Sequence, residues 1–178
     1  GTDGKPVNMD LWRPSKKGDG TWGIFSCESA YAREYAYDGG IDDDGKIVGK
    51  IPQYIYNGEE EKFTEVTDLT YTFLDCTGLR IAPEIPGSVT SMEETFKDCT
   101  GLTTAPEIPN SVTEMNGTFS GCTNLTGEIT INANLNSSEE WTYEDCFSDT
   151  TKPIQLTGTC PILSKLAETS SNGNVTVK

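Results

Sequence analysis

The chain has 178 residues, of which 34% are hydrophobic, and its 13 Lys and Arg against 28 Asp and Glu give a formal net charge of −15. This length predicts one domain, or one domain with a small cap. Because the chain contains no histidine, Ser-His-Asp and Cys-His nucleophile activation and histidine-held zinc are excluded. The acidic balance argues against nucleic acids and anionic membranes as partners, since both are bound through Lys and Arg.

The first 50 residues share no period with the rest of the chain, and we expect them to form a β-rich N-terminal cap. Residues 7–11 and 21–25 alternate apolar and polar side chains, as half-buried strands do. Residues 17–20 have the composition of a turn between them. A short stack of repeats needs such caps, because its terminal units otherwise expose the core.

Residues 51–55 have an Ile-Pro spacing that recurs twice further along the chain. They predict the first unit of a repeat, interrupted by an acidic insertion at residues 56–65. Tyr54 and Tyr56 lie beside this insertion with Phe63. Such aromatic side chains either pack the insertion onto the first unit or form a contact patch. Both tyrosines are therefore candidates for ligand binding.

A 23-residue period dominates the centre of the chain. Each copy has Val-Thr-x-Leu or Val-Thr-x-Met, then Phe-x-x-Cys-Thr, then a leucine three residues after the cysteine. A period of this length lies in the range of leucine-rich repeats, in which each unit is one turn of a stacked chain. The matched phenylalanines and cysteines are Phe73 and Cys76, Phe96 and Cys99, and Phe119 and Cys122.

The apolar residues of each copy are expected to face inward, because one turn of chain cannot bury them alone. We therefore expect Phe73 to contact Phe96, and Phe96 to contact Phe119. A fourth, looser copy aligns Tyr143 with these phenylalanines and Cys146 with the cysteines.

Two local elements are expected in each copy. Residues 91–96 predict a single helical or 3₁₀ turn with Ser91 as its N-cap. The segment after each cysteine predicts a short strand, in which Arg80, Thr103 and Thr126 point outward from one face. We take these three residues as further candidates for ligand binding.

Residues 151–178 are predicted to form a C-terminal cap. Proline followed by spaced apolar residues at 161–169 predicts a short helix, and Val-Thr-Val at 175–177 predicts a closing strand. The predicted fold is a mixed α/β repeat, a short leucine-rich-repeat solenoid of about four coils over residues 51–150. Short strands, single helical or 3₁₀ turns and irregular caps at both ends complete it.

The four repeat cysteines are the sharpest constellation for chemistry. We favour a column of buried thiols, because equivalent side chains of stacked coils point in parallel whereas a disulfide needs a crossing geometry. The Cys-x₂₋₄-Cys loop of a zinc site does not occur in the sequence. Disulfides or a metal within the column, and a bridge between Cys27 and Cys160, stay open as alternatives.

Acidic residues form two further rows. Asp75, Asp98 and Asp145 share one register, which a glycine interrupts, and Glu84 and Glu107 form the second. Calcium bound between stacked carboxylates is one interpretation. A solvated acidic face, screened by salt, is the one we favour. The sequence therefore predicts no catalytic, cofactor-binding or metal-binding residues.

The phrase Val-Thr-x-Met-x-x-Thr-Phe-x-x-Cys-Thr-x-Leu-x-x-Ala-Pro-Glu-Ile-Pro resembles the repeat of BspA-type leucine-rich surface proteins of bacteria. The resemblance covers residues 66–127 well and residues 128–150 loosely. It implies a secreted or cell-surface protein and, as in some members of that group, adhesion to host matrix proteins.

We therefore expect a non-catalytic, extracellular or cell-surface binding module without a cofactor, whose partner is an unidentified protein or glycan. The sequence has no run of about 18 apolar residues, so no membrane insertion is expected, and a monomer is favoured over an oligomer. Two alternatives stay open. One is a structural display or stalk segment of a larger surface assembly, and the other is a carbohydrate-active enzyme, which the abundant Glu and Asp pairs would permit.

Overall fold

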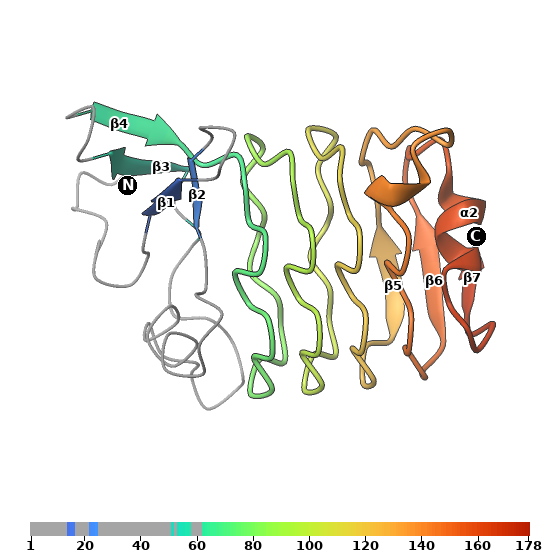
Figure 1. Cartoon of the computed structure of the whole chain (residues 1–178). Coiled ribbons are helices and arrows are strands. Elements are labelled where there is room, and N and C mark those ends of the chain that lie inside the picture. Colours follow the sequence, from blue (N-terminus) through green and yellow to red (C-terminus); the bar gives the residue numbers. More distant parts are fainter. Residues whose placement is uncertain (1–13, 17–21, 25–50, 52, 58–61) are drawn as a thin grey trace.

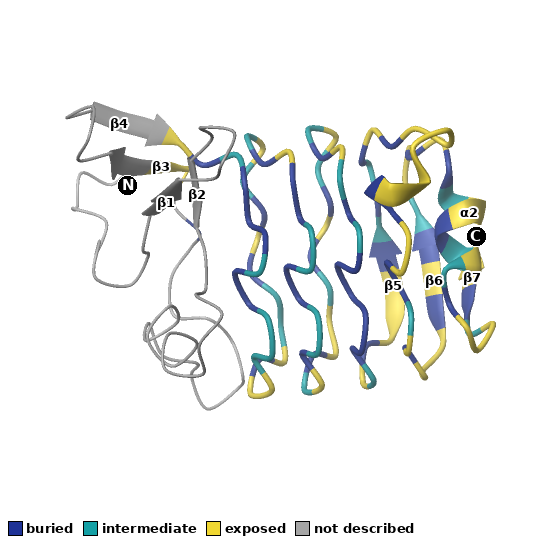
Figure 2. Cartoon of the chain, viewed as in Figure 1, coloured by how far each residue is buried: buried dark blue, intermediate teal, exposed yellow. Residues whose placement is uncertain are grey.

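The computed structural model describes residues 14–16, 22–24, 51, 53–57 and 62–178. In this part of the chain, two antiparallel strand pairs stand at one end, and a row of coils packed side by side follows them (Figure 1). Each coil runs along one wall of the stack and returns along the other. Buried residues, dark blue in Figure 2, recur in every coil, and their apolar side chains form the core.

The first antiparallel pair consists of β1 (Pro14–Lys16) and β2 (Trp22–Ile24). β2 falls within the strand expected at residues 21–25, and its partner is β1. The strand expected at residues 7–11 and the turn expected at residues 17–20 lie outside the described residues.

The second antiparallel pair consists of β3 (Tyr54–Asn57) and β4 (Lys62–Glu65). The insertion expected at residues 56–65 is thus the outer part of a strand pair. The stack begins directly after β4, where the Val66 amide donates a hydrogen bond to the Gln53 carbonyl at 2.7 Å.

A column of phenylalanine rings runs through the core. The ring centroids of Phe73 and Phe96 lie 5.3 Å apart, and those of Phe96 and Phe119 lie 5.6 Å apart, with the planes inclined by only 7° and 4°. All three rings are fully buried. Such pairs add about 0.5–1.5 kcal/mol beyond the burial of their area. The predicted contacts are confirmed, and the repeats stack as successive turns of the chain.

Backbone hydrogen bonds tie each coil to the next along one side of the stack. Every second amide donates to a carbonyl of the following coil, always in the same direction. These bonds satisfy backbone groups that stacking removes from water. In the second copy they run from Met92 to Glu114, from Glu94 to Asn116, from Phe96 to Thr118 and from Asp98 to Ser120, at 2.8–3.0 Å.

We call this side the turn wall (residues 69–75, 92–98, 115–121 and 143–149), because four-residue turns build it. The Met92 carbonyl accepts a hydrogen bond from the Thr95 amide at 3.1 Å. Glu94, the third residue of this turn, has a φ of 47°, and Asp98 repeats the arrangement one turn later with a φ of 58°. A left-handed third residue is typical of type II turns. The helical or 3₁₀ turn expected after Ser91 is therefore wrong, because a right-handed helix has no left-handed residues.

The last copy departs from the 23-residue period. Phe147, and not Tyr143, stacks on Phe119, with centroids 5.5 Å apart. Equivalent residues of the third and fourth copies are consequently 28 positions apart, because residues 136–140 are inserted. The alignment expected for Tyr143 and Cys146 is wrong, since ring packing and not a fixed period sets the register.

Parallel strands close the far end of the stack. β5 (Gly127–Thr130), β6 (Ile154–Thr157) and β7 (Val175–Val177) pair in that order. Two short helices, η1 (Glu140–Thr142) and α2 (Leu163–Glu168), belong to the segments between them. The short helix and the closing strand expected at this end of the chain are confirmed.

We call the other side the strand wall (residues 80–84 and 103–107, continued by β5, β6 and β7). Before β5 it contains fewer strands than the sequence predicts. Two of the three short strands predicted after the cysteines are reduced to one bridge, between Ile81 and Thr104. Glu84 and Glu107, the second predicted acidic row, are exposed on this wall. Glu107 accepts a hydrogen bond from the Asn132 side-chain amide at 2.9 Å.

Gly101 marks a close approach between two coils. A Cβ atom on Gly101 would lie 2.1 Å from the Thr77 carbonyl oxygen, whereas one on Gly87 would meet nothing within 4 Å. We therefore expect Gly101→Ala to force the coils apart and to lower the free energy of unfolding by about 1–3 kcal/mol. Gly87→Ala, the matched control, is expected to change it by less than about 1 kcal/mol. Urea unfolding followed by circular dichroism measures both, and equal stability of the two variants would contradict the close approach.

Candidate binding site

The three repeat residues expected to bind a ligand form one column on the strand wall. Arg80, Thr103 and Thr126 are all exposed. The Thr103 amide and hydroxyl donate to the Arg80 carbonyl at 2.8 and 3.0 Å, and the Thr126 hydroxyl donates to the Pro153 carbonyl at 2.8 Å. Both hydroxyl protons are therefore engaged by the backbone. The column presents a guanidinium group and two threonine side chains, and its role in binding stays a prediction.

The two candidate tyrosines lie elsewhere. Tyr54 is 48% exposed on β3, and the side chain of Tyr56 lies outside the described ones. β3 stands at the N-terminal end of the stack, whereas Thr126 directly precedes β5 toward the other end (Figure 1). The five predicted residues are therefore not brought together in one site.

An open hollow of about 590 Å³ lies beside the insertion in the last copy. It is bounded by one coil, by the insertion and by the start of the C-terminal helical segment. Thr126 precedes the start of β5, whereas the insertion follows the end of β5. The hollow and the column of Arg80, Thr103 and Thr126 therefore lie at different edges of the stack (Figure 1). The lining residues are Thr113, Asn134, Leu135, Asn136, Ser137, Glu139, Pro161 and Ile162.

Hydrogen bonds between residues close in sequence hold residues 136–140 in place. Asn136 Oδ1 accepts from the Ser138 amide at 3.1 Å and from its hydroxyl at 2.9 Å, which closes a local turn. The buried Thr142 hydroxyl donates to the Glu139 carbonyl at 2.6 Å. The hydroxyl of the buried Tyr143 donates to a carbonyl of the insertion at 3.4 Å. The rim of the hollow is therefore anchored to the core.

Trp141 stands two residues beyond the hollow-lining Glu139, within η1. Its side chain is 60% exposed, which makes it the most exposed of the large hydrophobic residues in the described part of the chain. The sequence-based candidates did not include it. The signal that was available is the break in the 23-residue period, because insertions in a repeat array map to surface loops, often on the binding face.

The polar side chains around the hollow offer donors and acceptors to a ligand. Within the described residues, neither Asn134 nor Glu139 makes a side-chain hydrogen bond, and both are exposed. An amide supplies both donors and an acceptor, and an ionised carboxylate supplies acceptors only. Thr113, from the preceding coil, donates its hydroxyl to the Thr90 carbonyl at 3.4 Å.

Within the described part of the chain the cysteines are thiols and not disulfides. Cys99 Sγ donates to the Phe73 carbonyl and Cys122 Sγ donates to the Phe96 carbonyl, both at 3.0 Å. Burial raises the pKa of Cys122 to about 12, and it raises the pKa of Cys99 well above the ordinary thiol value. These side chains are structural hydrogen-bond donors between coils.

Cys146 does not belong to this column, contrary to the sequence-based alignment. It directly precedes the stacked Phe147, and Thr150 takes the position three residues after that ring which cysteine holds in the other copies. Burial raises the pKa of Cys146. Cys27, the proposed partner of Cys160, lies outside the described residues.

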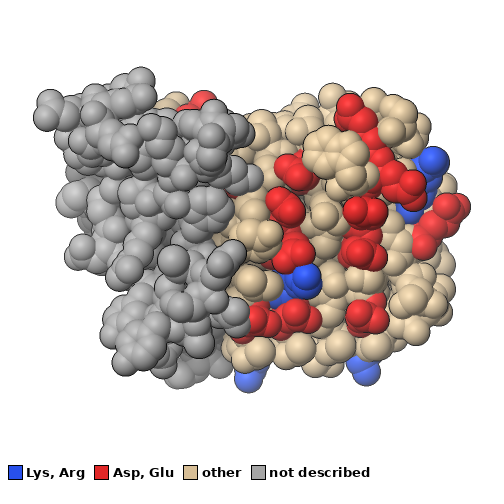
Figure 3. All heavy atoms as spheres, viewed as in Figure 1, with Lys and Arg blue, Asp and Glu red and all other residues tan. Residues whose placement is uncertain are grey.

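The turn wall carries acidic side chains over successive coils (Figure 3). Asp75 and Asp98 occupy equivalent left-handed turn positions, and Asp149, not Asp145, continues their row beyond Gly121. The expected place of Asp145 is wrong because the inserted residues shift the last copy. Among the residues that the structure describes, no group of His, Cys, Asp and Glu is arranged to hold a metal ion.

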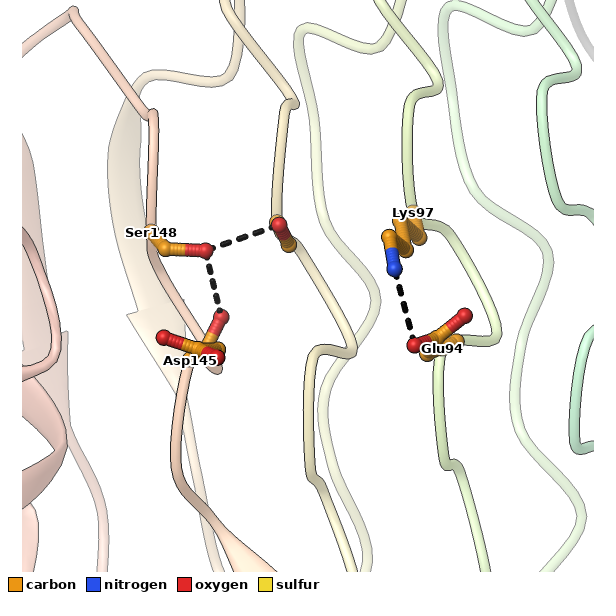
Figure 4. A network of polar contacts seen from close by, with 5 residues as sticks. Glu94, Lys97, Asp145 and Ser148 are labelled. Carbon is orange, nitrogen blue, oxygen red and sulfur yellow. Dashed lines mark hydrogen bonds and ion pairs between the residues drawn. The ribbon is translucent and has the colours of Figure 1, made fainter.

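Polar side-chain contacts on the turn wall lie within one coil or between neighbouring coils. Lys97 Nζ lies 2.8 Å from Glu94 Oε1 on the same coil (Figure 4). In the last copy, the hydroxyl groups of Ser148 and Ser120 meet at 2.8 Å, and Ser148 lies 3.1 Å from the Asp145 carbonyl (Figure 4). The ion pair is partly exposed, so we assign it at most about 1 kcal/mol.

Comparisons with known proteins give little. No protein-family model matches the chain, and no curated protein matches it. A solved structure that resembles it is that of a leucine-rich repeat protein from Bacteroides ovatus ATCC 8483, with 18% sequence identity and a TM-score of 0.47. The match covers 98% of this chain and 56% of that one, so the chain spans little more than half the length of that protein. None of the described helices is long and apolar enough to cross a lipid bilayer.

The buried thiols predict a pattern of chemical labelling. Because the thiolate is the reactive form and burial opposes it, we expect iodoacetamide at pH 8.5 to alkylate Cys99 and Cys122 only after unfolding. Cys76, which is only partly buried, should react before Cys99 and Cys122 in the folded protein. Peptide mass spectrometry at timed intervals, with and without urea, follows each site. Equal labelling rates at Cys76 and Cys99 in the folded protein would contradict this assignment.

Asp98 provides a pH-dependent test of the acidic row. Burial raises the pKa of this carboxyl group, and the neighbouring Asp75 carboxylate adds to the effect. The protonated form therefore stabilises the fold at low pH, and this contribution is lost as the pH rises through the raised pKa. Asp98→Asn keeps a side chain that tolerates the left-handed φ. We expect this variant to have a higher Tm than the parent at pH 7 and the same Tm at pH 3 in scanning calorimetry, and a lower Tm at pH 7 would disprove the repulsion.

Proposed function

We propose that the chain is a non-catalytic binding module of the leucine-rich-repeat type, built as a short solenoid of about four coils. It binds a protein or glycan partner outside the cell or on the cell surface. The observation that carries the proposal is the column of exposed Arg80, Thr103 and Thr126 on a wall of stacked coils. The 23-residue period and the stacked rings support the repeat type.

Rigidity is what makes such a wall suited to recognition. The backbone of each coil is hydrogen-bonded to its neighbours on both walls, and the rings below it are close-packed. Side chains on this scaffold keep a fixed spacing and lose little conformational entropy when a partner binds. A partner that contacts Arg80 can therefore contact Thr103 and Thr126 at the same time.

Charge narrows the kind of protein partner. The chain carries a formal charge of −15, and Glu84 and Glu107 are exposed on the strand wall that carries the column. A partner with a basic patch is steered toward such a surface, at a rate that falls as salt is added. This supports a protein partner of positive surface charge, or an uncharged glycan.

The test is binding of the purified chain to immobilised matrix proteins and glycans by biolayer interferometry. We expect the double variant Arg80→Ala/Thr103→Ala to weaken the affinity for a bound partner about tenfold, equivalent to about 1.4 kcal/mol. Thr90→Ala is the matched control, because its exposed hydroxyl donates to the Thr67 carbonyl at 3.0 Å as that of Thr103 does to Arg80. If the double variant and the control bind with equal affinity, the column does not belong to the binding face. If none of the immobilised matrix proteins and glycans binds the chain, a display or stalk segment is favoured.

A further inference from the structure

An exposed aromatic ring, that of Trp141, lies two residues along the chain from Glu139, which lines the hollow beside residues 136–140. Trp141 is 60% exposed, yet the flanking Thr142 and Tyr143 are buried. The Met115 amide donates to the Thr142 carbonyl at 2.6 Å, so the coil-to-coil ladder holds the backbone directly after the ring. A large aromatic side chain that leaves most of its surface in water, on a backbone held by this ladder, is typical of a contact residue.

The groups that line the hollow suit a ligand rich in hydroxyl groups. Asn134 and Glu139 have no side-chain partner among the described residues, and Ser137 adds a hydroxyl. An amide that both donates and accepts, in the same hollow as a carboxylate that only accepts, matches the hydroxyl groups of a sugar, each of which is donor and acceptor. Leu135 and Ile162 give the floor an apolar part.

Size and charge distinguish between ligands. A volume of about 590 Å³ falls within the range of about 300–1,000 Å³ for small-ligand pockets. The core of a protein interface is depleted in charged residues, whereas Glu139 lies in this hollow and Glu140 beside it. The same carboxylates and the net charge of −15 repel uronates, sulfated sugars and phosphates.

We infer that this hollow is a subsite for an uncharged oligosaccharide, with hydroxyl groups of the ligand bonded to Asn134 and Glu139 in the hollow and the apolar face of a sugar ring against Trp141 on the adjoining η1. This inference rests on the proposed binding role and names a ligand class for it. It places glycan recognition at the insertion, at the opposite edge of the stack from Arg80, Thr103 and Thr126.

The test is isothermal titration of the full chain with soluble hexasaccharides of glucose, mannose, xylose and galacturonic acid. We expect at least one of the three neutral hexasaccharides to bind and galacturonate to bind at least tenfold more weakly. Trp141→Ala should lower the affinity at least tenfold, and Trp141→Phe should retain part of it, because a smaller ring stacks over less area. Glu139→Gln should alter it several-fold.

Val177→Ala is the control, since Val177 is a further exposed apolar side chain of the described residues, lies on β7 and does not line the hollow. Its affinity should equal that of the parent, and the thermal unfolding midpoint of Trp141→Ala should stay near that of the parent because the ring is exposed. Binding of no neutral hexasaccharide, equal loss in Trp141→Ala and Val177→Ala, or a preference for galacturonate would each overturn the inference. If a matrix protein still binds the parent through Arg80 and Thr103 in such a case, the proposed function stands and only the glycan subsite falls.

Discussion

The distance between neighbouring coils is the constraint from which the rest of the structure follows. The centroids of neighbouring phenylalanine rings lie 5.3–5.6 Å apart. Alternate backbone amides of each coil donate hydrogen bonds of nearly equal length to carbonyls of the next coil. Both interactions ask for the same separation, so packing and hydrogen bonding reinforce each other. A single coil satisfies neither, which is why the fold exists only as a stack.

The turn wall explains part of the composition. Its left-handed positions are held by Tyr71, Glu94 and Asp98 and by glycines such as Gly117 and Gly121. Asp and Gly adopt a positive φ at lower cost than most residues, so the chain geometry selects them there. Some of the acidity of this wall therefore serves the backbone. Surface charge at these positions is therefore in part a by-product of the turns.

The sequence was most informative where the period is exact. It placed Phe73, Phe96 and Phe119 in one column and the C-terminal helix and strand in their correct places. It failed in the last copy, because Tyr143-Glu-Asp-Cys146 imitates the pattern of Phe96-Lys-Asp-Cys99 and conceals the inserted residues. Trp141 was missed for the same reason, since a mistaken register makes the insertion look like a degraded repeat. The turn conformation at Glu94 was not predictable from propensity, because bonds to the next coil determine it.

Residues 136–140 lengthen one coil without moving its neighbours. Before them Ile131 still pairs with Ile108, and after them the Gly117 amide again reaches the Glu144 carbonyl at 3.0 Å. The edge between the two walls therefore tolerates loops of different length and composition, as surface connections generally do. At this edge, segments with new specificities can be exchanged as cassettes on an unchanged scaffold.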